Sequence, residues 1–157
     1  MGQQQLLLVI LVTIIVGIAT VVAINTFGSA ADSANLDAVR QDVAQIAAAA
    51  QGFYMKPEML GGGGRSFEGI TFNDIAFAAN GISANGLSAQ NENGRYELPA
   101  VPADAQTFVI TAHPSSDDTY VPGAVDDDGV LTGGTAAGDP GTATISANNA
   151  TAVSFGS

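Results

Sequence analysis

The chain has 157 residues, of which 15 are Asp or Glu and 4 are Lys or Arg, so its formal net charge is −11 and its isoelectric point is about 4.1. This acidity excludes nucleic acid as an expected partner, because binding to phosphates needs clustered basic side chains. Cysteine is absent, so neither a disulfide framework nor a thiolate metal site can form. The length allows one modest domain beside a membrane segment.

Residues 6–24 form an uninterrupted apolar stretch. It holds no charged residue, its only polar side chains are Thr13 and Thr20, and fourteen of its nineteen residues are Leu, Ile or Val. A helix rising about 1.5 Å per residue would let it cross a hydrocarbon core about 30 Å thick. The first basic residue is Arg40, so the basic start of a secretory signal is lacking. We therefore predict a membrane anchor whose orientation is not set by Lys or Arg.

The helical pattern continues past the apolar stretch as an amphipathic segment. Apolar residues recur there at spacings of three and four, which places them on one face of a helix. Pro57 is the first proline, and it predicts that the helix ends soon after Tyr54. A single helix from about Gln3 to Phe53 would be about 75 Å long. Its expected apolar face comprises Leu36, Val39, Val43, Ile46, Ala50 and Phe53.

The segment after the long helix is predicted to contain loops and one short helix. Residues 61–64 are all glycine, which predicts a flexible joint. Thr71 and Asp74 fit a capping box before a short helix over residues 72–79, and Asn80 with Gly81 fits its end. The sequence Ala-Asn-Gly-Ile-Ser at residues 79–83 is echoed by Ala-Asn-Gly-Leu-Ser at residues 84–88, and we interpret both as successive turns of a surface loop.

Short strand candidates dominate the rest of the chain. Phe108, Ile110 and Ala112 alternate on one face, as do Val153 and Phe155, and this alternation is typical of half-buried strands. Hairpin turns are expected at Asp128-Gly129 and at residues 147–150, and a mobile loop at residues 133–142. Strands are predicted at residues 95–98, 107–112, 124–126, 130–132, 142–146 and 152–155.

Together these elements predict an α+β fold in two parts. Residues 1–53 would form the long helix, and residues 54–157 a β-rich globular head with glycine-rich loops. The apolar face of a small antiparallel sheet should pack on the amphipathic half of the helix. The helix residues expected at this contact are Val39, Val43, Ile46 and Phe53.

This layout resembles the type IV pilin superfamily, which includes bacterial and archaeal pilins and type II secretion pseudopilins. The resemblance rests on the early glycine, the two halves of the helix, the Phe53-Tyr54 pair near a proline, and the glycine-punctuated β domain. Residues 107–131 also resemble the pilin pattern of a central strand, a loop and a strand that runs into an Asp-Gly turn. The resemblance implies a subunit that polymerises with copies of itself into an extracellular filament. It also implies a membrane-anchored state before assembly and contact with an export or assembly machinery.

The resemblance further implies that the first half of the helix forms the filament core. In the family, a Glu at the fifth mature position is thought to pair with a neighbour's terminal amine. Here that position holds Gln5, or Leu7 if the chain is cut after Gly2, and none of the first 31 residues is acidic. Glutamine amides cost less to bury than an unpaired charge, so we predict that they form hydrogen bonds between subunits. Alternatively, they are a polar cap at the membrane interface. The expected core contacts are Gln3, Gln4, Gln5, Leu6, Leu7, Ile10, Ile14, Val16, Gly17 and Val21.

Residues suited to catalysis are scarce. His113 is the only histidine, so a multi-histidine metal site is excluded within one chain. A catalytic triad with Ser115 and Asp117 would have to form within one loop beside Pro114, and no nucleophile-elbow motif is present. We interpret His113 as a polar surface residue, and we expect neither catalysis nor a cofactor.

Two further motifs have a functional and a simpler interpretation. Asp126, Asp127 and Asp128 are weak candidates for Ca²⁺ binding, but the distal Glu of a calcium loop is missing, which favours an acidic turn. Asn149 begins a formal Asn-Ala-Thr glycosylation sequon, a pattern that also arises often by chance.

Three functions remain open at this stage. The first is a structural subunit of an extracellular filament, located at the cell surface. The second is a monomeric, membrane-anchored binding module, and the third is a pseudopilin-like component of a secretion machine. A monomeric anchor gives no reason for an amphipathic helix to extend far beyond the bilayer, which favours the first and third.

Overall fold

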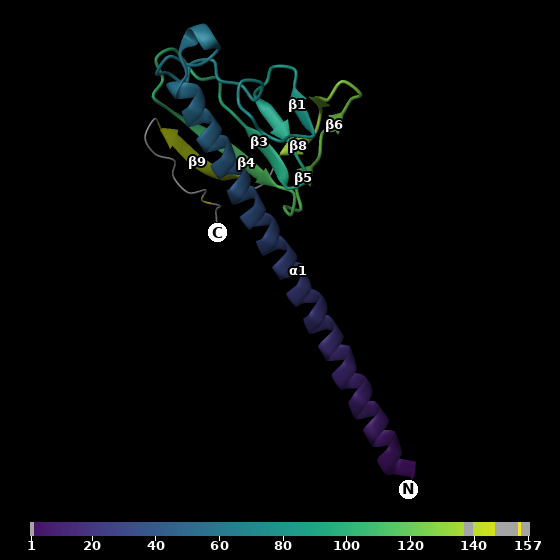
Figure 1. The fold of residues 1–157 in the computed structure, drawn as a ribbon. Helices are drawn as coiled ribbons and strands as arrows, with labels where there is room; N and C mark the ends of the chain where they lie inside the picture. Colours follow the sequence, from purple (N-terminus) through teal and green to yellow (C-terminus); the bar gives the residue numbers. More distant parts are fainter. Residues whose placement is uncertain (1, 137–139, 147–153, 155–157) are drawn as a thin grey trace. The chain divides into compact units, whose positions relative to one another are not determined.

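The computed structural model describes residues 2–136, 140–146 and 154. Its largest element is helix α1 (Gly2–Met55), which is 54 residues long and is followed by the short 3₁₀ helix η1 (Glu58–Leu60) (Figure 1). The helix ends two residues before Pro57, whose ring disfavours helical geometry in the residue before it. The predicted helix from about Gln3 to Phe53 and its end near the first proline are confirmed.

By packing, the chain divides into two compact units, Met1–Ala34 and Asn35–Ser157. The division falls inside α1, between Ala34 and Asn35. The second unit therefore contains the amphipathic half of the helix together with the β-rich head. The second of these units, Asn35–Ser157, is the head unit.

The head unit is built on a seven-stranded sheet in the order β6-β7-β1-β2-β3-β4-β9 (Figure 1). Neighbouring strands are antiparallel except β1 and β7, which run parallel. A second sheet pairs β5 (Tyr120–Val121) with β8 (Thr135–Ala136). The seven strands are β1 (Gly81–Ser83), β2 (Ser88–Gln90), β3 (Gly94–Glu97), β4 (Thr107–Pro114), β6 (Ala124–Val125), β7 (Val130–Thr132) and β9 (Gly141–Ser146). One long helix with a mostly antiparallel sheet confirms the predicted α+β fold.

The core of the head unit lies between one face of α1 and one face of the sheet. From the helix, Val39, Val43 and Ile46 are buried, and Phe53 packs partly buried against the same cluster. From β4, Phe108, Ile110 and Ala112 are buried while Val109 between them is exposed, which confirms the predicted alternation. Further members of the core are Ala50, Phe67, Phe72, Tyr96 and Ile145.

The predicted short helix over residues 72–79 is wrong. Asp74 Oδ2 does accept hydrogen bonds from the amide and the hydroxyl of Thr71, but no helix follows. Phe72 donates its amide to the carbonyl of Gly86 at 2.8 Å. Phe72 and Ile75 are both buried in the core, and Phe77 packs against it. An irregular chain lets these side chains reach the core, and their burial outweighs the local capping signal.

The prediction that both repeated pentapeptides form turns of a surface loop is wrong. Gly81, expected to end a helix, begins β1, and the second copy forms the turn into β2. β1 and β2 are antiparallel, with Ile82 opposite Ala89. The positive φ of 71° at Gly86 lets the chain reverse between them. Residue types that usually form turns therefore lie both in the turn between β1 and β2 and in strand β1 itself.

Residues 61–64 are a compact turn, and the prediction of a flexible joint is wrong. Their four amides donate in order to the carbonyls of Glu58, Pro57, Phe53 and Lys56. A Cβ atom at Gly62 would collide with Lys56, and one at Gly63 with the carbonyl of Ser66. Gly62 and Gly63 are needed because the backbone packs too closely there for side chains, whereas Gly61 and Gly64 adopt positive φ values of 74° and 55°.

Most of the other strand predictions are confirmed, with two differences. Residues 133–142, predicted as a mobile loop, include β8 and the start of β9. β5 and β8 were not predicted, since two-residue strands carry no periodicity. The turn at residues 147–150 and most of the strand at residues 152–155, with Val153 and Phe155, lie outside the described residues. Within that strand, Ser154 is described and forms an antiparallel bridge with Thr142.

Candidate assembly surface

The apolar stretch at residues 6–24 is fully uncovered within one chain. Its Leu, Ile and Val side chains are between 49% and 67% exposed, and none of the most apolar window is buried. Helix α1 is long and apolar enough to cross a membrane. A surface of this kind is stable in water only when lipid or protein covers it, because exposed apolar area costs about 25 cal/mol per Å².

The few polar groups of this stretch are satisfied inside the helix. The hydroxyl of Thr13 donates to the carbonyls of Val9 and Ile10 at 3.0 and 2.8 Å, and that of Thr20 donates to Val16 at 2.8 Å. Backbone groups within a helix are likewise paired. The surface therefore offers almost no hydrogen-bonding demand to whatever covers it, whether lipid or another helix.

The residues predicted to form filament-core contacts are all exposed in the single chain. They surround the helix rather than marking one face, because consecutive residues point in different directions. Gly17 has no heavy atom within 4 Å of the position that a Cβ would occupy, so a neighbouring backbone has room to approach there. The exposed set is Gln3, Gln4, Gln5, Leu6, Leu7, Ile10, Ile14, Val16, Gly17 and Val21.

The second half of α1 is fixed in the head unit by a polar cluster that sequence reasoning missed. Asp42 Oδ2 accepts hydrogen bonds from the hydroxyl of Tyr96 at 2.6 Å and from the Nδ2 atoms of Asn91 and Asn93, both at 2.8 Å. Asn35 donates to the carbonyl of Asn93 at 2.9 Å. Asn35 and Asp42 are seven residues apart, so both lie on the same side of the helix. In the sequence, the only signal of this cluster is this spacing of two polar residues next to the apolar face of the helix.

Tyr96 is held as a hydrogen-bond donor by its surroundings. Burial raises the pKa of its phenol far above the ordinary value, and the hydrogen bond and charge of Asp42 raise this pKa further. The hydroxyl therefore stays protonated across the physiological range and always donates to Asp42. The cluster therefore joins the second half of the helix to β3 and the chain before it through hydrogen bonds to one carboxylate.

The structure gives the catalytic candidates separate structural partners. His113 is only 8% exposed, so its interpretation as a surface residue is wrong: β4 extends to Pro114 and pairs His113 with Arg95. Burial lowers the pKa of the His113 imidazole, and the nearby Arg95 lowers this pKa too, while Glu97 and Asp117 oppose the shift. The hydroxyl of Ser115 donates to the carbonyl of Glu92 and accepts from Asn35. Asp117 Oδ1 accepts from the amide and the hydroxyl of Thr119.

The acidic turn is organised by its own backbone. Asp126 Oδ1 accepts hydrogen bonds from the amides of Asp128 and Val130 at 3.1 and 2.7 Å, which closes the hairpin between β6 and β7. Gly129 has a φ of 78°, as the predicted Asp-Gly turn requires. Within the described residues, no group of three or more His, Asp or Glu side chains is placed to hold a metal ion. Asn149 lies outside the described residues.

No family model, no curated protein and no solved structure matches this chain.

Proposed function

We propose that this protein is a structural subunit that polymerises through the first half of α1 into an extracellular, pilin-like filament. Before assembly, residues 6–24 lie across a membrane, and the head is outside the cell. On assembly, the same residues leave the lipid and pack against their counterparts in neighbouring subunits. The role is mechanical and does not include catalysis.

The observation that carries this proposal is the contrast between the two halves of α1. A single-pass anchor needs about 20 apolar residues. This helix supplies them, all exposed, and then continues for more than 20 residues into the core of the head unit. Such continuity is useful when the apolar half must be transferred from lipid to a protein core while the head remains attached to it.

Packing decides whether this transfer is favourable. Lipid tails are as apolar as leucine, so exchanging lipid for protein brings no hydrophobic gain. Close packing and hydrogen bonds between subunits must therefore supply the free energy that favours the assembled state. Gly17 allows close approach of a neighbouring backbone, and Gln3, Gln4 and Gln5 offer donors and acceptors that a neighbour's terminal amine and carbonyls can use.

A shearing experiment tests the proposal. Intact cells that express the chain are sheared, the released material is pelleted, and fibres are identified by electron microscopy and by immunogold labelling of the head. We expect this chain to be the main component of long fibres in the sheared fraction. Recovery of the chain only from the membrane fraction, as monomers, would contradict the proposal and favour an anchored binding module. Short assemblies confined to the cell envelope would instead favour a pseudopilin-like role.

A further inference from the structure

The charged side chains are divided unevenly along the chain. Residues 1–31 hold no Asp, Glu, Lys or Arg, so the half of α1 that is proposed to pack between copies carries no charged side chain. All 15 acidic and all 4 basic residues lie from Asp32 onward, and together they account for the net charge of −11. The part of the chain proposed to join copies and the part that carries the charge are therefore different.

Most of the acidic side chains are exposed to solvent. The structure contains the ion pairs Asp37–Arg40 and Glu97–Arg95. Because the chain has only 4 basic residues for 15 acidic ones, pairing within the chain leaves most of the acidic charge to be balanced by dissolved cations. Among the described residues, the exposed acidic ones are Asp32, Asp37, Glu58, Glu68, Asp74, Glu92, Asp104, Asp118, Asp126, Asp127 and Asp128.

The exposed acidic residues of the head unit lie in several separate loops rather than in one patch. Glu92 lies between β2 and β3, and Asp118 lies between β4 and β5. Asp128 lies in the hairpin between β6 and β7, and Glu58 begins η1 after the end of α1. A second copy that approaches the head from any of these sides therefore meets negative charge like its own.

Packing of the apolar halves brings the heads of different copies close together. Packed helices lie about 8–10 Å apart, whereas a unit as long as the head has a radius of gyration of about 14 Å. The head unit also begins at Asn35, soon after the apolar stretch ends at Ile24. Like charges on neighbouring heads repel over about 30 Å at 0.01 M salt but over only about 3 Å at 1 M.

We propose that ionic strength regulates assembly: filaments of this protein form and persist only where dissolved salt screens the repulsion between the acidic heads of neighbouring copies. Residues 6–24 pack through uncharged side chains, so their contacts need no screening. The repulsion between heads, in contrast, grows as salt is removed. Below a threshold salt concentration it exceeds the free energy gained by packing, and the copies separate. This inference rests on the proposed function and adds a condition under which the polymer is stable.

A salt titration of sheared filaments tests this regulation. Filaments of the full chain are dialysed into NaCl between about 1 M and about 0.01 M, at one fixed concentration of a non-ionic detergent that can cover released helices. The pelleted fraction is measured, with near-ultraviolet circular dichroism of the head. We expect at least about tenfold less pelleted protein at the lowest salt, because the repulsion then extends over about the width of a head.

Two results of this titration would overturn the proposal. The first is a fibre that stays intact at the lowest salt. The second is disassembly that coincides with loss of the circular dichroism signal, because salt would then act on the folding of the head rather than on contacts between copies.

The kind of solute distinguishes screening from a specifically bound cation. NaCl and KCl at equal ionic strength should preserve filaments equally, because screening depends on ionic strength. Sucrose carries no charge and should not replace either salt, although it also favours burial of apolar surface. A requirement for one of the two cations, or preservation by sucrose, would overturn screening as the cause.

Removing charge from the head should lower the salt requirement. Asp118→Asn, Asp127→Asn and Asp128→Asn together remove three negative charges and change the net charge from −11 to −8. All three side chains are exposed, so the fold should persist. Repulsion between two heads scales with the product of their charges and falls by about half, so the salt midpoint of disassembly should fall about twofold.

The matched control replaces the same three aspartates by glutamate, which keeps the charge and should keep the wild-type midpoint. Equal midpoints in the asparagine and glutamate variants would overturn the proposal.

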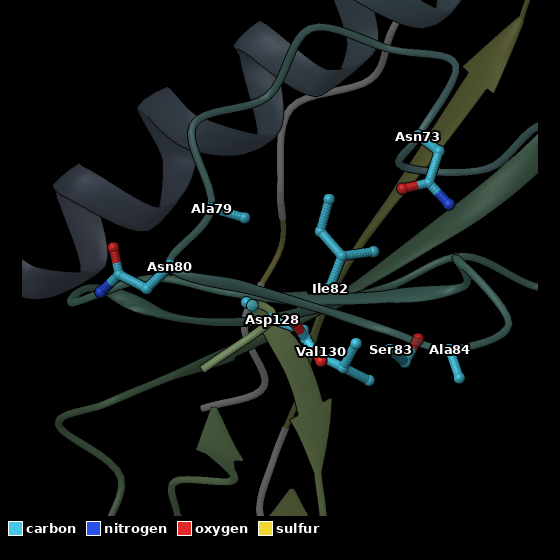
Figure 2. Close-up of a pocket in the computed structure, with 10 residues that line it drawn as sticks. Asn73, Ala79, Asn80, Ile82, Ser83, Ala84, Asp128 and Val130 are labelled. Carbon is cyan, nitrogen blue, oxygen red and sulfur yellow. The ribbon is translucent and has the colours of Figure 1, made fainter. Parts of the chain in front are cut away.

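Adding charge should have the opposite effect. Asn73 and Asn80 are exposed and, with Asp128, line a pocket of about 380 Å³ beside β1 and β7 (Figure 2). Asn73→Asp with Asn80→Asp should raise the salt midpoint, and Asn73→Gln with Asn80→Gln should not. An unchanged midpoint in the aspartate variant would overturn the regulation by salt while leaving the proposed function intact. Absence of filaments from the unmodified chain at every salt concentration would overturn the proposed function, and this inference with it.

Discussion

The two halves of α1 are both helical, but their apolar side chains are exposed in the first half and buried in the second. In the first half, residues 6–24 are apolar on every side, and all of these side chains are exposed. In the second half, apolar residues occupy one face, and Val39, Val43 and Ile46 on that face are buried. The comparison shows that helical periodicity alone does not identify a surface that needs a partner. What matters is whether the rest of the chain covers it, and among the described residues only the second half has buried apolar side chains.

The largest expected difference between the two halves appears when a charge is placed in each. Val16→Asp should abolish filaments, because a carboxylate in the middle of a membrane helix costs about 3 kcal/mol and has no partner in a packed core. Gln41→Asp, on the exposed side of the second half, should leave filaments unchanged. Filament yield after shearing is the measurement. Normal fibres from the Val16→Asp protein would refute the packing of the first half.

Truncating an isoleucine in each half should reverse the order of the two effects. Ile46 is fully buried, so Ile46→Ala should lower the free energy of unfolding of the head by about 2–5 kcal/mol. Ile14→Ala removes an exposed side chain and should leave that free energy unchanged. Denaturant unfolding of the detergent-solubilised full chain, followed by near-ultraviolet circular dichroism, measures both. Equal losses in the two variants would mean that the halves do not differ as described.

Polar residues sharpen the comparison within the second half. Asp42→Ala removes the acceptor shared by Tyr96, Asn91 and Asn93, and leaves a buried phenol unpaired. We expect a loss of about 1–3 kcal/mol in unfolding free energy. The control is Asp37→Ala, which removes an exposed pair with Arg40 at 2.6 Å and should cost less than about 1 kcal/mol. Equal free energies of unfolding for the two variants would mean that the cluster does not stabilise the head unit.

Within the first half, the glutamines should matter less than the apolar residues. Replacing Gln3, Gln4 and Gln5 together by Leu should reduce filament yield or disturb subunit register, while membrane insertion is kept. Single replacements should have little effect, because adjacent amides can substitute for one another. Yield and fibre diffraction are compared with wild type. Wild-type filaments in wild-type amounts would identify the glutamines as a cap at the membrane interface only.

The smallest expected effect concerns pH and the head alone. Burial lowers the pKa of His113 in the folded state, whereas in the unfolded chain it ionises near its ordinary pKa of about 6.5. As pH falls below about 6.5, the imidazole binds a proton more readily in the unfolded state than in the folded state, so the free energy of unfolding decreases. Unfolding midpoints between pH 7.5 and 5.5 measure this slope, and His113→Gln should flatten it. An unchanged slope in that variant would assign the effect to other groups.

Much of the fold could be predicted because its strongest signals are local. The long helix follows from spacings of three and four and from the absence of proline before Pro57, and β4 follows from the alternation at Phe108, Ile110 and Ala112. β1 could not be predicted, since its Gly-Ile-Ser sequence resembles a turn and its strand character comes from partners in β2 and β7. The same reason explains residues 72–79, where burial of Phe72 and Ile75 overrides a capping signal.

Of the candidate surfaces, too, one could be predicted from the sequence and another could not. The exposed apolar half could be identified from composition, because residues 6–24 hold no charged residue and are long enough to cross a membrane as a helix. The cluster around Asp42 could not, because its partners lie 49 to 54 residues away. His113 was misjudged because β4 continues through it to Pro114.

Imaging sheared filaments at side-chain resolution tests the central claim most directly. We expect residues 6–24 of each copy to lie in the centre of the fibre, packed against the same residues of neighbouring copies. We also expect the Val39, Val43 and Ile46 face to remain in contact with its own head. Fibres in which the apolar half lies on the outside, or fibres that do not contain this chain, would contradict the proposed packing.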